Sequence, residues 1–359
     1  MPGGCFDLRL MSTMIDTHLE ATVAALLRPG KGILAADESL PTIGRRFAAL
    51  GIPSTAENRR AYRELLCTTP HLNECISGVI LHDETTSQRT HQGETLPGVL
   101  TRRGIVPGVK VDGGTIDLAN FAGEKITCGL DGLRERLLTY RELGARFTKW
   151  RAVIAIDHGR PTATCITANA RVLALFAALS QEAGLVPIVE PEVLTAGDHT
   201  LARCGEVTGQ TLEIVFTQLT EHRVILKGML LKAGMVLSGQ DCPQQAKAEE
   251  VAEATRRCLR SVVPAAVPGI LFLSGGQSDV QATERLNAIC LAGDTPWKLS
   301  FSFGRALQDA AMKTWGGSPD HAEAAQSALL HRARCNGLAV EGRYTSDAEH
   351  RDPAPLTGP

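Results

Sequence analysis

The sequence lacks the features that mark several classes of protein. Basic and acidic residues nearly balance, with 37 Lys plus Arg against 39 Asp plus Glu, so no charged stripe points to nucleic acid or to an anionic membrane surface. No run of 18 apolar residues occurs, and the first ten residues lack the basic start and apolar core of a secretory leader. We therefore expect a soluble, cytoplasmic protein with neither a nucleic-acid nor a membrane partner.

Cysteine and histidine are present but never clustered. The ten cysteines form no CxxC pair, which is unlike the frameworks of small disulfide-bonded or zinc-binding domains, so we interpret them as reduced, mostly buried thiols. The ten histidines form no HxH or HxxxH pair. No GxGxxG motif follows the first predicted strand. We expect neither a metal site nor a dinucleotide or other cofactor.

One pattern recurs along the chain: a short apolar run, a glycine-rich or polar junction, and a longer segment with helical periodicity. The near-continuous apolar run Leu185–Val189 indicates a strand buried on both faces, as in a parallel sheet. Helical segments include Leu130 to Leu143 and, after the capping residue Ser278, Val280 to Leu291. The eight predicted strands are Gly32 to Ser39, Cys75 to Glu84, Ile105 to Asp112, Phe147 to Ile156, Leu185 to Val193, Val224 to Lys232, Gly269 to Gly276 and Leu299 to Arg305.

Eight strand–helix units favour a closed (β/α)₈ TIM barrel, and an open doubly wound sheet is the alternative. Barrels of this kind often form one domain of this length, so we predict a single domain over residues 1–359. Two segments lie outside the repeat. A helical extension is predicted at about residues 12–30, and a polar, proline-rich and therefore mobile tail at about residues 342–359.

Charged and polar side chains gather at the carboxyl ends of the predicted strands, where barrel enzymes place their active sites. Lys149 and Arg151 are two residues apart on one strand and therefore share a face. A charged cluster at this many strand ends is not explained by core packing. The other residues at these ends are Asp37, Glu38, Ser39, Lys110, Asp112, Glu190, Glu192, Lys232, Ser274 and Arg305.

Lys232 ends an apolar strand with an amine. Burying an ammonium group is costly, so its pKa usually falls and the side chain becomes a nucleophile. Lys149 lies two strands earlier, and alternate strands of a barrel contribute to the same layer of side chains. Two amines in one layer each disfavour the other's charge, which favours a lysine able to form a Schiff base. Taken alone, Lys232 could equally extend to the surface.

Glycines near the last two strands indicate a site for an anion. Backbone amides at Ser274-Gly275-Gly276 and at Gly304, together with Arg305, could form a phosphate cup. Taken alone, the glycine pair is more typical of a turn. Lys110 and Arg46 offer positive charge for a second phosphate. Two anion sites suggest a bisphosphorylated substrate.

These segments resemble class I fructose-bisphosphate aldolases, and they follow in collinear order from about Gly30 to Thr345. The resemblance implies a lyase that reversibly cleaves fructose 1,6-bisphosphate to dihydroxyacetone phosphate and glyceraldehyde 3-phosphate, in glycolysis and gluconeogenesis, without metal. It also implies a homo-oligomer, commonly a tetramer. The matching segments are Gly32–Ser39, Glu57–Arg60, Gly108–Asp112, Gly129–Arg134, Lys149–Arg151, Val186–Glu192, Leu230–Lys232, Phe272–Ser278 and Phe301–Leu307.

The resemblance assigns a role to each catalytic candidate. Lys232 attacks the C2 ketone and forms the Schiff base, and Glu190 is the general acid/base for dehydration and for the C4 hydroxyl. Asp37 orients and exchanges protons with the intermediates. Lys149 polarises them and lowers the pKa of Lys232, and Glu192 tunes the lysines. The ketone-side phosphate is assigned to Ser274, Gly275, Gly304 and Arg305, and the other phosphate to Ser39, Arg46, Lys110 and Arg151.

The sequence also departs from the family pattern. Ala233-Gly234 replaces the usual Pro-Asn after the nucleophile, Lys227 replaces a glutamate, and Phe303 replaces a common tyrosine. Animal members end in a tyrosine thought to move the C3 proton of the enamine, whereas Tyr344 is the last tyrosine here. We therefore expect Glu190 or water to protonate the enamine. The alternatives are a Schiff-base aldolase that prefers a monophosphate such as fructose 1-phosphate, and a non-catalytic barrel scaffold.

Overall fold

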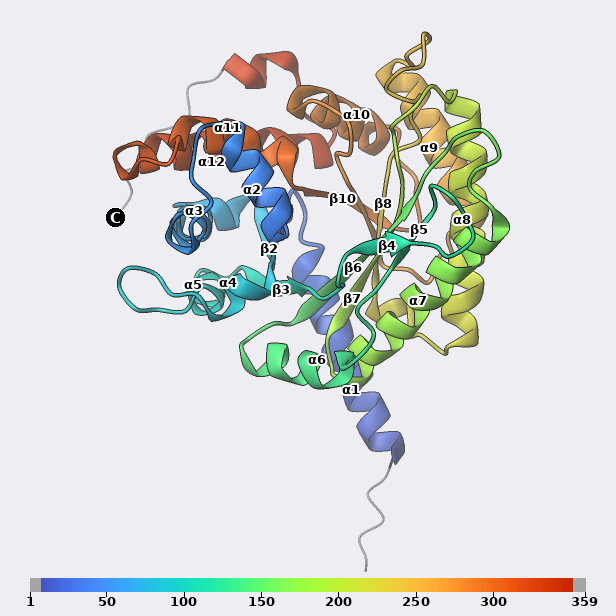
Figure 1. Ribbon diagram of the computed structural model, residues 1–359, viewed down its shortest axis with the longest axis horizontal. Coiled ribbons are helices and arrows are strands. Elements are labelled where there is room, and N and C mark those ends of the chain that lie inside the picture. Colours follow the sequence, from blue (N-terminus) through green and yellow to red (C-terminus); the bar gives the residue numbers. More distant parts are fainter. Residues whose placement is uncertain (1–7, 351–359) are drawn as a thin grey trace, which may run out of the picture.

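Eight parallel strands close into a barrel in the computed structural model, which describes residues 8–350, with side chains from residue 17. Each of these strands is followed in the chain by helical segments, which together form an outer ring (Figure 1). The (β/α)₈ TIM barrel predicted from the sequence is confirmed. The barrel strands are β1 (Gly32–Ala36), β2 (Ile76–Leu81), β3 (Val106–Lys110), β6 (Phe147–Ile154), β7 (Val186–Val193), β8 (Leu230–Ala233), β9 (Gly269–Phe272) and β10 (Lys298–Phe303).

Helices surround this sheet and begin at polar caps. Ser278 caps α10, as the sequence suggested, because its hydroxyl accepts from the backbone N–H of Gln281. The helices are α1 (Leu8–Leu26), α2 (Leu40–Ala48), α3 (Ala56–Thr68), α4 (Asp83–Ser87), α5 (Leu96–Arg102), α6 (Leu133–Glu142), α7 (Ala163–Glu182), α8 (Leu201–Glu221), α9 (Ala248–Val262), α10 (Asp279–Leu291), α11 (Arg305–Trp315) and α12 (Ala322–Val340). Within residues 8–350 the short 3₁₀ helices are η1 (Leu72–Glu74), η2 (Leu226–Gly228), η3 (Pro319–His321) and η4 (Ser346–His350).

The inside of the barrel is apolar at its amino-terminal end. There α1 packs Leu19, Val23 and Leu26 against inward side chains of the strands, among them Phe147 and Leu230. The helical extension that the sequence suggested thus closes the bottom of the barrel. The opposite, carboxyl-terminal end is left open to polar side chains.

Two segments differ from the predicted strands. Residues 224–229, predicted as the start of a strand, instead contain η2, because the side-chain amide of Gln181 bonds to the backbone of Ile225 and Gly228. A short antiparallel hairpin, β4 (Thr115–Asp117) and β5 (Lys125–Thr127), was not predicted. Asn169 on α7 holds it through the carbonyl of Lys125. Its two strands are too short and too polar to give a periodic signal.

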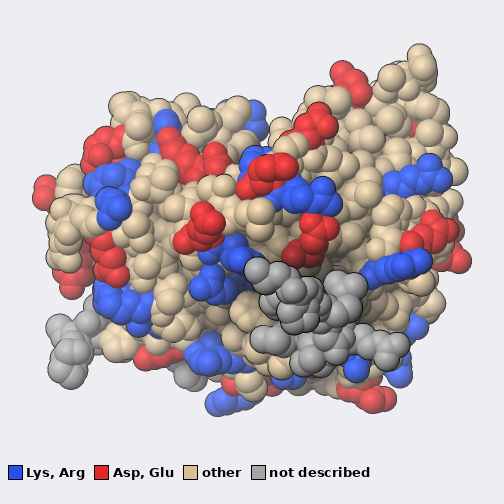
Figure 2. All heavy atoms as spheres, turned by 90° about the horizontal axis from the view of Figure 1, so that it is seen from below, with Lys and Arg blue, Asp and Glu red and all other residues tan. Residues whose placement is uncertain are grey.

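Helix α7 is apolar enough, by length and composition, to cross a membrane, and it is the one such helix in residues 8–350. Half of that stretch is buried against the rest of the protein. Phe176 on this helix packs against Trp150 on β6, with ring centroids 5.5 Å apart. It therefore packs as a core helix of the barrel. On the face of the molecule drawn in Figure 2, positively and negatively charged side chains are interspersed.

The first part of the segment predicted as a mobile tail is ordered. Residues 342–350 pack on the barrel, because Tyr344 and Ala348 are buried in the main core. The Tyr344 hydroxyl donates to Glu349 at 2.6 Å, and Glu349 forms an ion pair with the buried Arg332. The remaining part of the predicted tail, residues 351–359, lies outside the described residues.

Candidate active site

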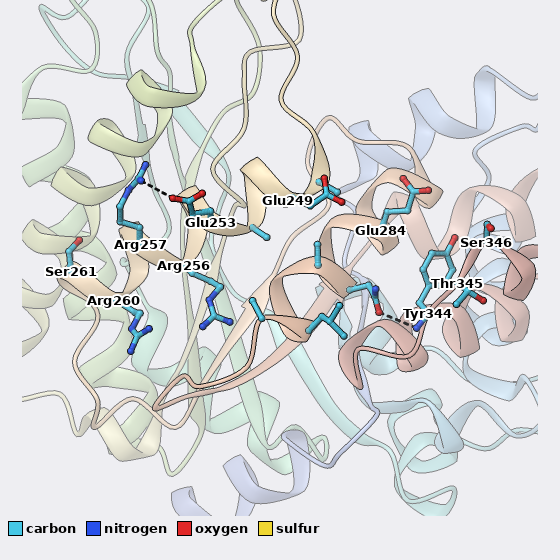
Figure 3. Close-up of a pocket in the computed structure, with 16 residues that line it drawn as sticks. Glu249, Glu253, Arg256, Arg257, Arg260, Ser261, Glu284, Tyr344, Thr345 and Ser346 are labelled. Atoms are coloured by element: carbon cyan, nitrogen blue, oxygen red, sulfur yellow. Dashed lines mark hydrogen bonds and ion pairs between the residues drawn. The ribbon is translucent and has the colours of Figure 1, made fainter.

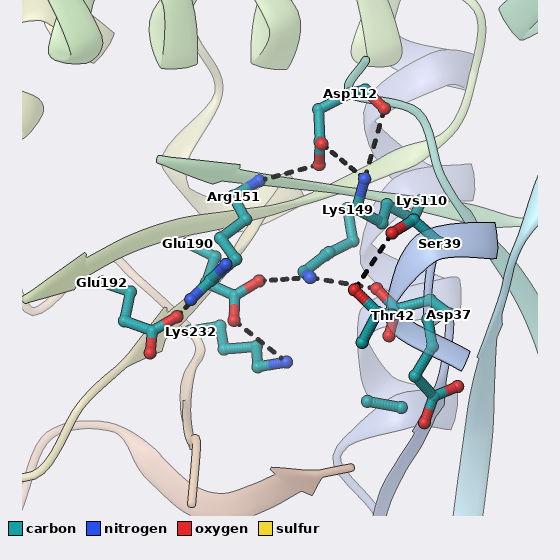
Figure 4. Close-up of polar contacts among 12 residues, drawn as sticks. Asp37, Ser39, Thr42, Lys110, Asp112, Lys149, Arg151, Glu190, Glu192 and Lys232 are labelled. Carbon is teal, nitrogen blue, oxygen red and sulfur yellow. Dashed lines mark hydrogen bonds and ion pairs between the residues drawn. The ribbon is translucent and has the colours of Figure 1, made fainter. Parts of the chain in front are cut away.

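A cavity of about 960 Å³ opens at the carboxyl-terminal ends of the strands. All residues assigned a catalytic or substrate-binding role from the resemblance line it, although they come from seven of the eight barrel strands or the segments that follow them. Figure 4 shows the central group. The lining includes Asp37, Ser39, Arg46, Lys110, Lys149, Arg151, Glu190, Glu192, Lys232, Ser274, Gly275, Gly304 and Arg305.

Four buried groups form a continuous chain of alternating charge at the base of this cavity (Figure 4). Lys232 Nζ lies 3.2 Å from Glu190 Oε1, and Glu190 Oε2 lies 2.7 Å from Lys149 Nζ. The Lys149 amine also donates to Asp37 Oδ2 at 3.0 Å. Three of these groups are on different strands and Asp37 directly follows a fourth, β1, so the closed barrel is what brings them together. Each charge is offset by a neighbour of opposite sign, which makes their burial tolerable.

Burial lowers the pKa of both lysines, that of Lys149 to about 8. Two carboxylates contact Lys149, whereas only Glu190 contacts Lys232. The proton is therefore held more firmly on Lys149, and Lys232 is the amine that is free to act as a nucleophile.

Several neighbouring charges act on the pKa of Lys232. Burial has the largest effect and lowers this pKa, and the cation of Arg151 lowers it further. Asp37 and Glu192 act in the opposite direction and favour the ammonium form. The two lysines also disfavour each other's charge, since the charge of Lys232 lowers the pKa of Lys149.

Asp37 stays ionised although it is buried. Burial alone would raise its pKa, but the charges of Lys149 and Lys232 outweigh this effect and hold the pKa well below the ordinary range of an aspartate. An aspartate that remains charged at neutral pH can orient hydroxyl groups and stabilise cationic intermediates.

Arg151 and Lys110 bring positive charge to one side of the cavity. Arg151 is paired with Glu192, and its side chain is 39% exposed, so its guanidinium can still meet a ligand. Lys110 is paired with Asp112. A second oxygen of Asp112 accepts from the backbone N–H of Arg151 at 3.2 Å, which ties the two strands together. The pair is suited to an anion such as a phosphate.

Backbone amides dominate the opposite side. A Cβ on Gly275 would lie 3.0 Å from Glu192 Oε1, so the loop after β9 passes close to the site. Gly304 is the N-cap of α11, whose first residue is Arg305. The unpaired N–H groups and the dipole at a helix N-terminus favour an anion. Ser274 adds a hydroxyl at the same end of the cavity.

Arg46 lies elsewhere than expected. It was grouped with Lys110 and Arg151 on the basis of the sequence, but its guanidinium contacts Glu38 and, at 2.8 Å, Asp309. Asp309 is on α11, one turn after Arg305. Arg46 therefore lies toward the Gly304 side of the cavity. Its helix, α2, leaves β1, and β1 pairs directly with β10.

Several lining residues were not predicted from the sequence: Thr42, Arg45, His82 and Ser302. Thr42 follows Ser39 by one helical turn, and the two hydroxyls lie 3.1 Å apart, so spacing could have revealed it. His82 follows the end of β2, the one strand end to which no site residue was assigned.

A larger cavity, of about 1200 Å³, lies between α9 and α10 (Figure 3). Arg256, Arg257 and Arg260 line it, and Arg257 is paired with Glu253 at 3.4 Å. Neither a lysine nor a histidine is among its lining residues. It therefore offers neither an amine nucleophile nor an imidazole base.

His331, Cys335 and Glu349 form a group whose ligand atoms lie within 4.8 Å of one another. Glu349 is already engaged by Arg332 and Tyr344. None of the three lines the active-site cavity, so this group has no part in the chemistry described above.

Comparison with known proteins gives consistent results. A family model described as fructose-bisphosphate aldolase class-I matches residues 18–354. A probable fructose-bisphosphate aldolase class 1 of Xanthomonas campestris pv. campestris is 54% identical over 329 residues, covering 91% of this chain and 98% of that protein. The cytosolic fructose-bisphosphate aldolase 4 of Arabidopsis thaliana is 49% identical over 342 residues, covering 95% of this chain and 87% of that protein. The fructose-bisphosphate aldolase of Plasmodium falciparum, crystallised with TRAP and a small-molecule inhibitor, has a TM-score of 0.92 and 44% identity, covering 93% of this chain and 96% of that one.

Proposed function

The chain belongs to the class I fructose-bisphosphate aldolase family, and on this premise we propose how its own residues perform the reaction. The enzyme is a lyase that cleaves fructose 1,6-bisphosphate reversibly to dihydroxyacetone phosphate and glyceraldehyde 3-phosphate. One observation carries the assignment of residues: a buried amine, Lys232, contacts a buried carboxylate, Glu190, which also contacts the second buried amine, Lys149.

The first half of the reaction forms the Schiff base. The neutral amine of Lys232 attacks the C2 carbonyl, and the oxygen becomes the hydroxyl of a carbinolamine. Glu190, 3.2 Å from the amine, can move the proton that the nitrogen loses to the carbonyl oxygen, which gives this hydroxyl. A second proton, taken up from water and delivered by the same carboxyl group, then converts the hydroxyl into a leaving water molecule. Water then leaves, and the nitrogen lone pair forms the C=N bond of an iminium ion.

The second half breaks the C3–C4 bond. A base removes the C4 hydroxyl proton, the aldehyde leaves, and the bonding electrons pass to the iminium to give an enamine. We assign the base to Glu190, and the polarisation of the intermediates to Lys149 and Asp37. Protonation of the enamine at C3 and hydrolysis return Lys232 and release dihydroxyacetone phosphate. The Tyr344 hydroxyl is bound to Glu349 and does not line the cavity, so we assign the C3 proton to Glu190 or water.

The substrate lies across the cavity between two anion sites. We assign the ketone-side phosphate to the amide-rich side, and we add Arg46 to that side because it contacts Asp309 on α11. Ser39, Lys110 and Arg151 receive the second phosphate. With opposite ends fixed, C2 is held in front of Lys232 in the orientation that the attack requires. The ketone-side set is Arg46, Ser274, Gly275, Gly304 and Arg305.

We further propose that the protein works in the cytoplasm as a homotetramer of single-domain barrels. The name of the Arabidopsis thaliana relative places that protein in the cytosol, and the scattered cysteines fit a reducing compartment. Size-exclusion chromatography with light scattering tests the tetramer directly.

A preference for a monophosphate is the second candidate. Lys110 and Arg151 line the cavity apart from the amide-rich side, which favours the bisphosphate. The ratio of kcat/KM for fructose 1,6-bisphosphate to that for fructose 1-phosphate decides between the two. A ratio below one would support the monophosphate.

Borohydride reduction in the presence of dihydroxyacetone phosphate tests the proposed nucleophile. We expect a stable adduct on the peptide that contains Lys232, and none in Lys232→Met. Lys227→Met is the matched control, because Lys227 lies on the same segment but is exposed, and it should form the adduct normally. An adduct on another lysine would contradict the mechanism, and complete absence of an adduct would support a non-catalytic scaffold.

A further inference from the structure

His82 is a half-buried residue of the cavity for which the mechanism above has no role. It follows the last residue of β2 and is the N-cap of α4. Besides the active-site cavity it lines a side pocket of about 350 Å³, and Lys110 and Asp112 also line both. The remaining wall of the side pocket is formed by Asp83, Val111, Arg136, Thr139 and Tyr140.

The position of His82 in the barrel is opposite the nucleophile. In the closed order of strands, β2 and β8 are separated by three strands on either side. Strand β3 is the neighbour of β2, and Leu81 on β2 is in register with Val109 on β3. His82 is the residue after Leu81, so it lies level with Lys110. An extended substrate bound through C2 at Lys232 therefore directs its far end toward His82.

Hydrogen bonding leaves one nitrogen of the imidazole ring available. Nδ1 accepts from the backbone N–H of Glu84 at 3.3 Å, which places the proton of the neutral ring on Nε2. Within the described residues, Nε2 has no hydrogen-bond partner. His82 thus offers an N–H donor at the boundary between the two cavities.

The charges around His82 favour its neutral form. Burial has the largest effect and lowers its pKa, and the cations of Arg63 on α3 and Lys110 on β3 lower it further. Asp83 and Asp37 act in the opposite direction. Asp83 accepts from the Tyr140 hydroxyl of α6 at 2.7 Å. On the same helix, Arg136 donates to the carbonyls of Val111 and Gly129.

We propose that His82 binds the aldehyde-side phosphate of the substrate, donating Nε2–H to a phosphate oxygen beside Lys110. The inference rests on the function proposed above. Lys110 shares its charge with Asp112, so a further donor at the end of the neighbouring strand completes a site for a doubly charged group. When the ring gains a proton, the added positive charge strengthens this contact.

Substitution of His82 tests the proposal. His82→Phe keeps a planar ring but removes the donor, and should raise KM for fructose 1,6-bisphosphate about tenfold, as the loss of one charge-assisted hydrogen bond does. KM for fructose 1-phosphate, which lacks the second phosphate, should change less than about twofold. His82→Gln, whose amide nitrogen can replace Nε2, should restore most of the affinity for the bisphosphate.

The pH dependence gives a second readout. Because the pKa is lowered, the imidazole gains its proton only below the ordinary value of about 6.5, and KM for the bisphosphate should then fall in wild type relative to His82→Phe. Equal changes for both substrates, no change, or a Gln variant as weak as the Phe variant would overturn the proposal.

Borohydride trapping separates this inference from the proposed function. Dihydroxyacetone phosphate carries only the ketone-side phosphate, so His82→Phe should be trapped at Lys232 as efficiently as wild type. Normal trapping also shows that the variant is folded. Failure to trap the wild type would overturn the proposed function, whereas a trapped His82→Phe with an unchanged KM for the bisphosphate would overturn only the role of His82.

Discussion

Glu190 Oε1 lies 3.2 Å from the amine of Lys232 on the neighbouring strand, and both side chains are almost completely buried. A carboxylate at this distance can exchange protons with the nitrogen without large movement. Its other oxygen is 2.7 Å from Lys149, so the same group also holds the second amine in its charged form. Acid/base chemistry and the division of charge between the lysines thus depend on one side chain.

Replacing Glu190 with Gln should lower kcat by about 10² to 10⁴, because the amide has nearly the same shape but cannot transfer a proton. Steady-state kinetics with fructose 1,6-bisphosphate measures the effect. Glu124→Gln is the matched control, since Glu124 is a buried carboxylate that binds Thr162 outside the cavity. An equal loss of kcat in both variants would show that Glu190 has only a structural role.

The rate of borohydride trapping with dihydroxyacetone phosphate should rise with pH as Lys232 loses its proton. Since burial and then Arg151 lower this pKa, the rise should occur below the ordinary lysine value of about 10.4. Arg151→Met removes a cation, so the ammonium form is favoured and the rise should move to higher pH. The control Arg45→Met removes an exposed cation that also lines the cavity; if it moves the curve as far, the effect is not specific to Arg151.

The central residues could be predicted from the sequence because the information is local. Strand periodicity places Lys149 and Arg151 on one face, and an amine that ends an apolar run, as Lys232 does, is conspicuous. A closed barrel then brings the carboxyl ends of the strands together regardless of the conformation of the loops. All of the predicted site residues line the cavity for this reason.

Contacts between distant segments could not be predicted in the same way. Arg46 is directed to one side of the cavity by Asp309, 263 residues later in the chain, and no sequence pattern reports such a pairing. Residues 224–229 are mostly apolar and rich in β-forming residues, which predicts a strand. Their backbone instead bonds to a single side chain, that of Gln181, and not to a neighbouring strand. His82 is the N-cap of a helix of only five residues. Such a short helix gives no periodic signal, so the sequence does not indicate that His82 lines the cavity.

The two anion sites can be separated by substrate. Arg46→Ala should raise KM for fructose 1-phosphate and for fructose 1,6-bisphosphate by similar factors, about tenfold, because both carry the ketone-side phosphate. Lys110→Ala should raise KM only for the bisphosphate. If Arg46→Ala instead affects only the bisphosphate, Arg46 belongs with Lys110 and Arg151, as its sequence context first suggested.

The apolar base of the barrel should be intolerant of added volume at Gly108. A Cβ there would lie 2.4 Å from the Phe147 ring, which is fully buried and has no room to move. Gly108→Ala should therefore destabilise the protein by about 1 to 3 kcal/mol, the usual cost of overpacking, and lower the midpoint of thermal unfolding. Gly44→Ala is the matched control, because its Cβ would meet Ser54 at an ordinary 3.6 Å and alanine is the better helix former.

Adding Phe147→Leu to Gly108→Ala should recover part of the loss, since the smaller side chain makes room for the new methyl group. If the double variant is less stable than Gly108→Ala by the full cost of Phe147→Leu alone, the two residues do not interact and the close contact is not the cause.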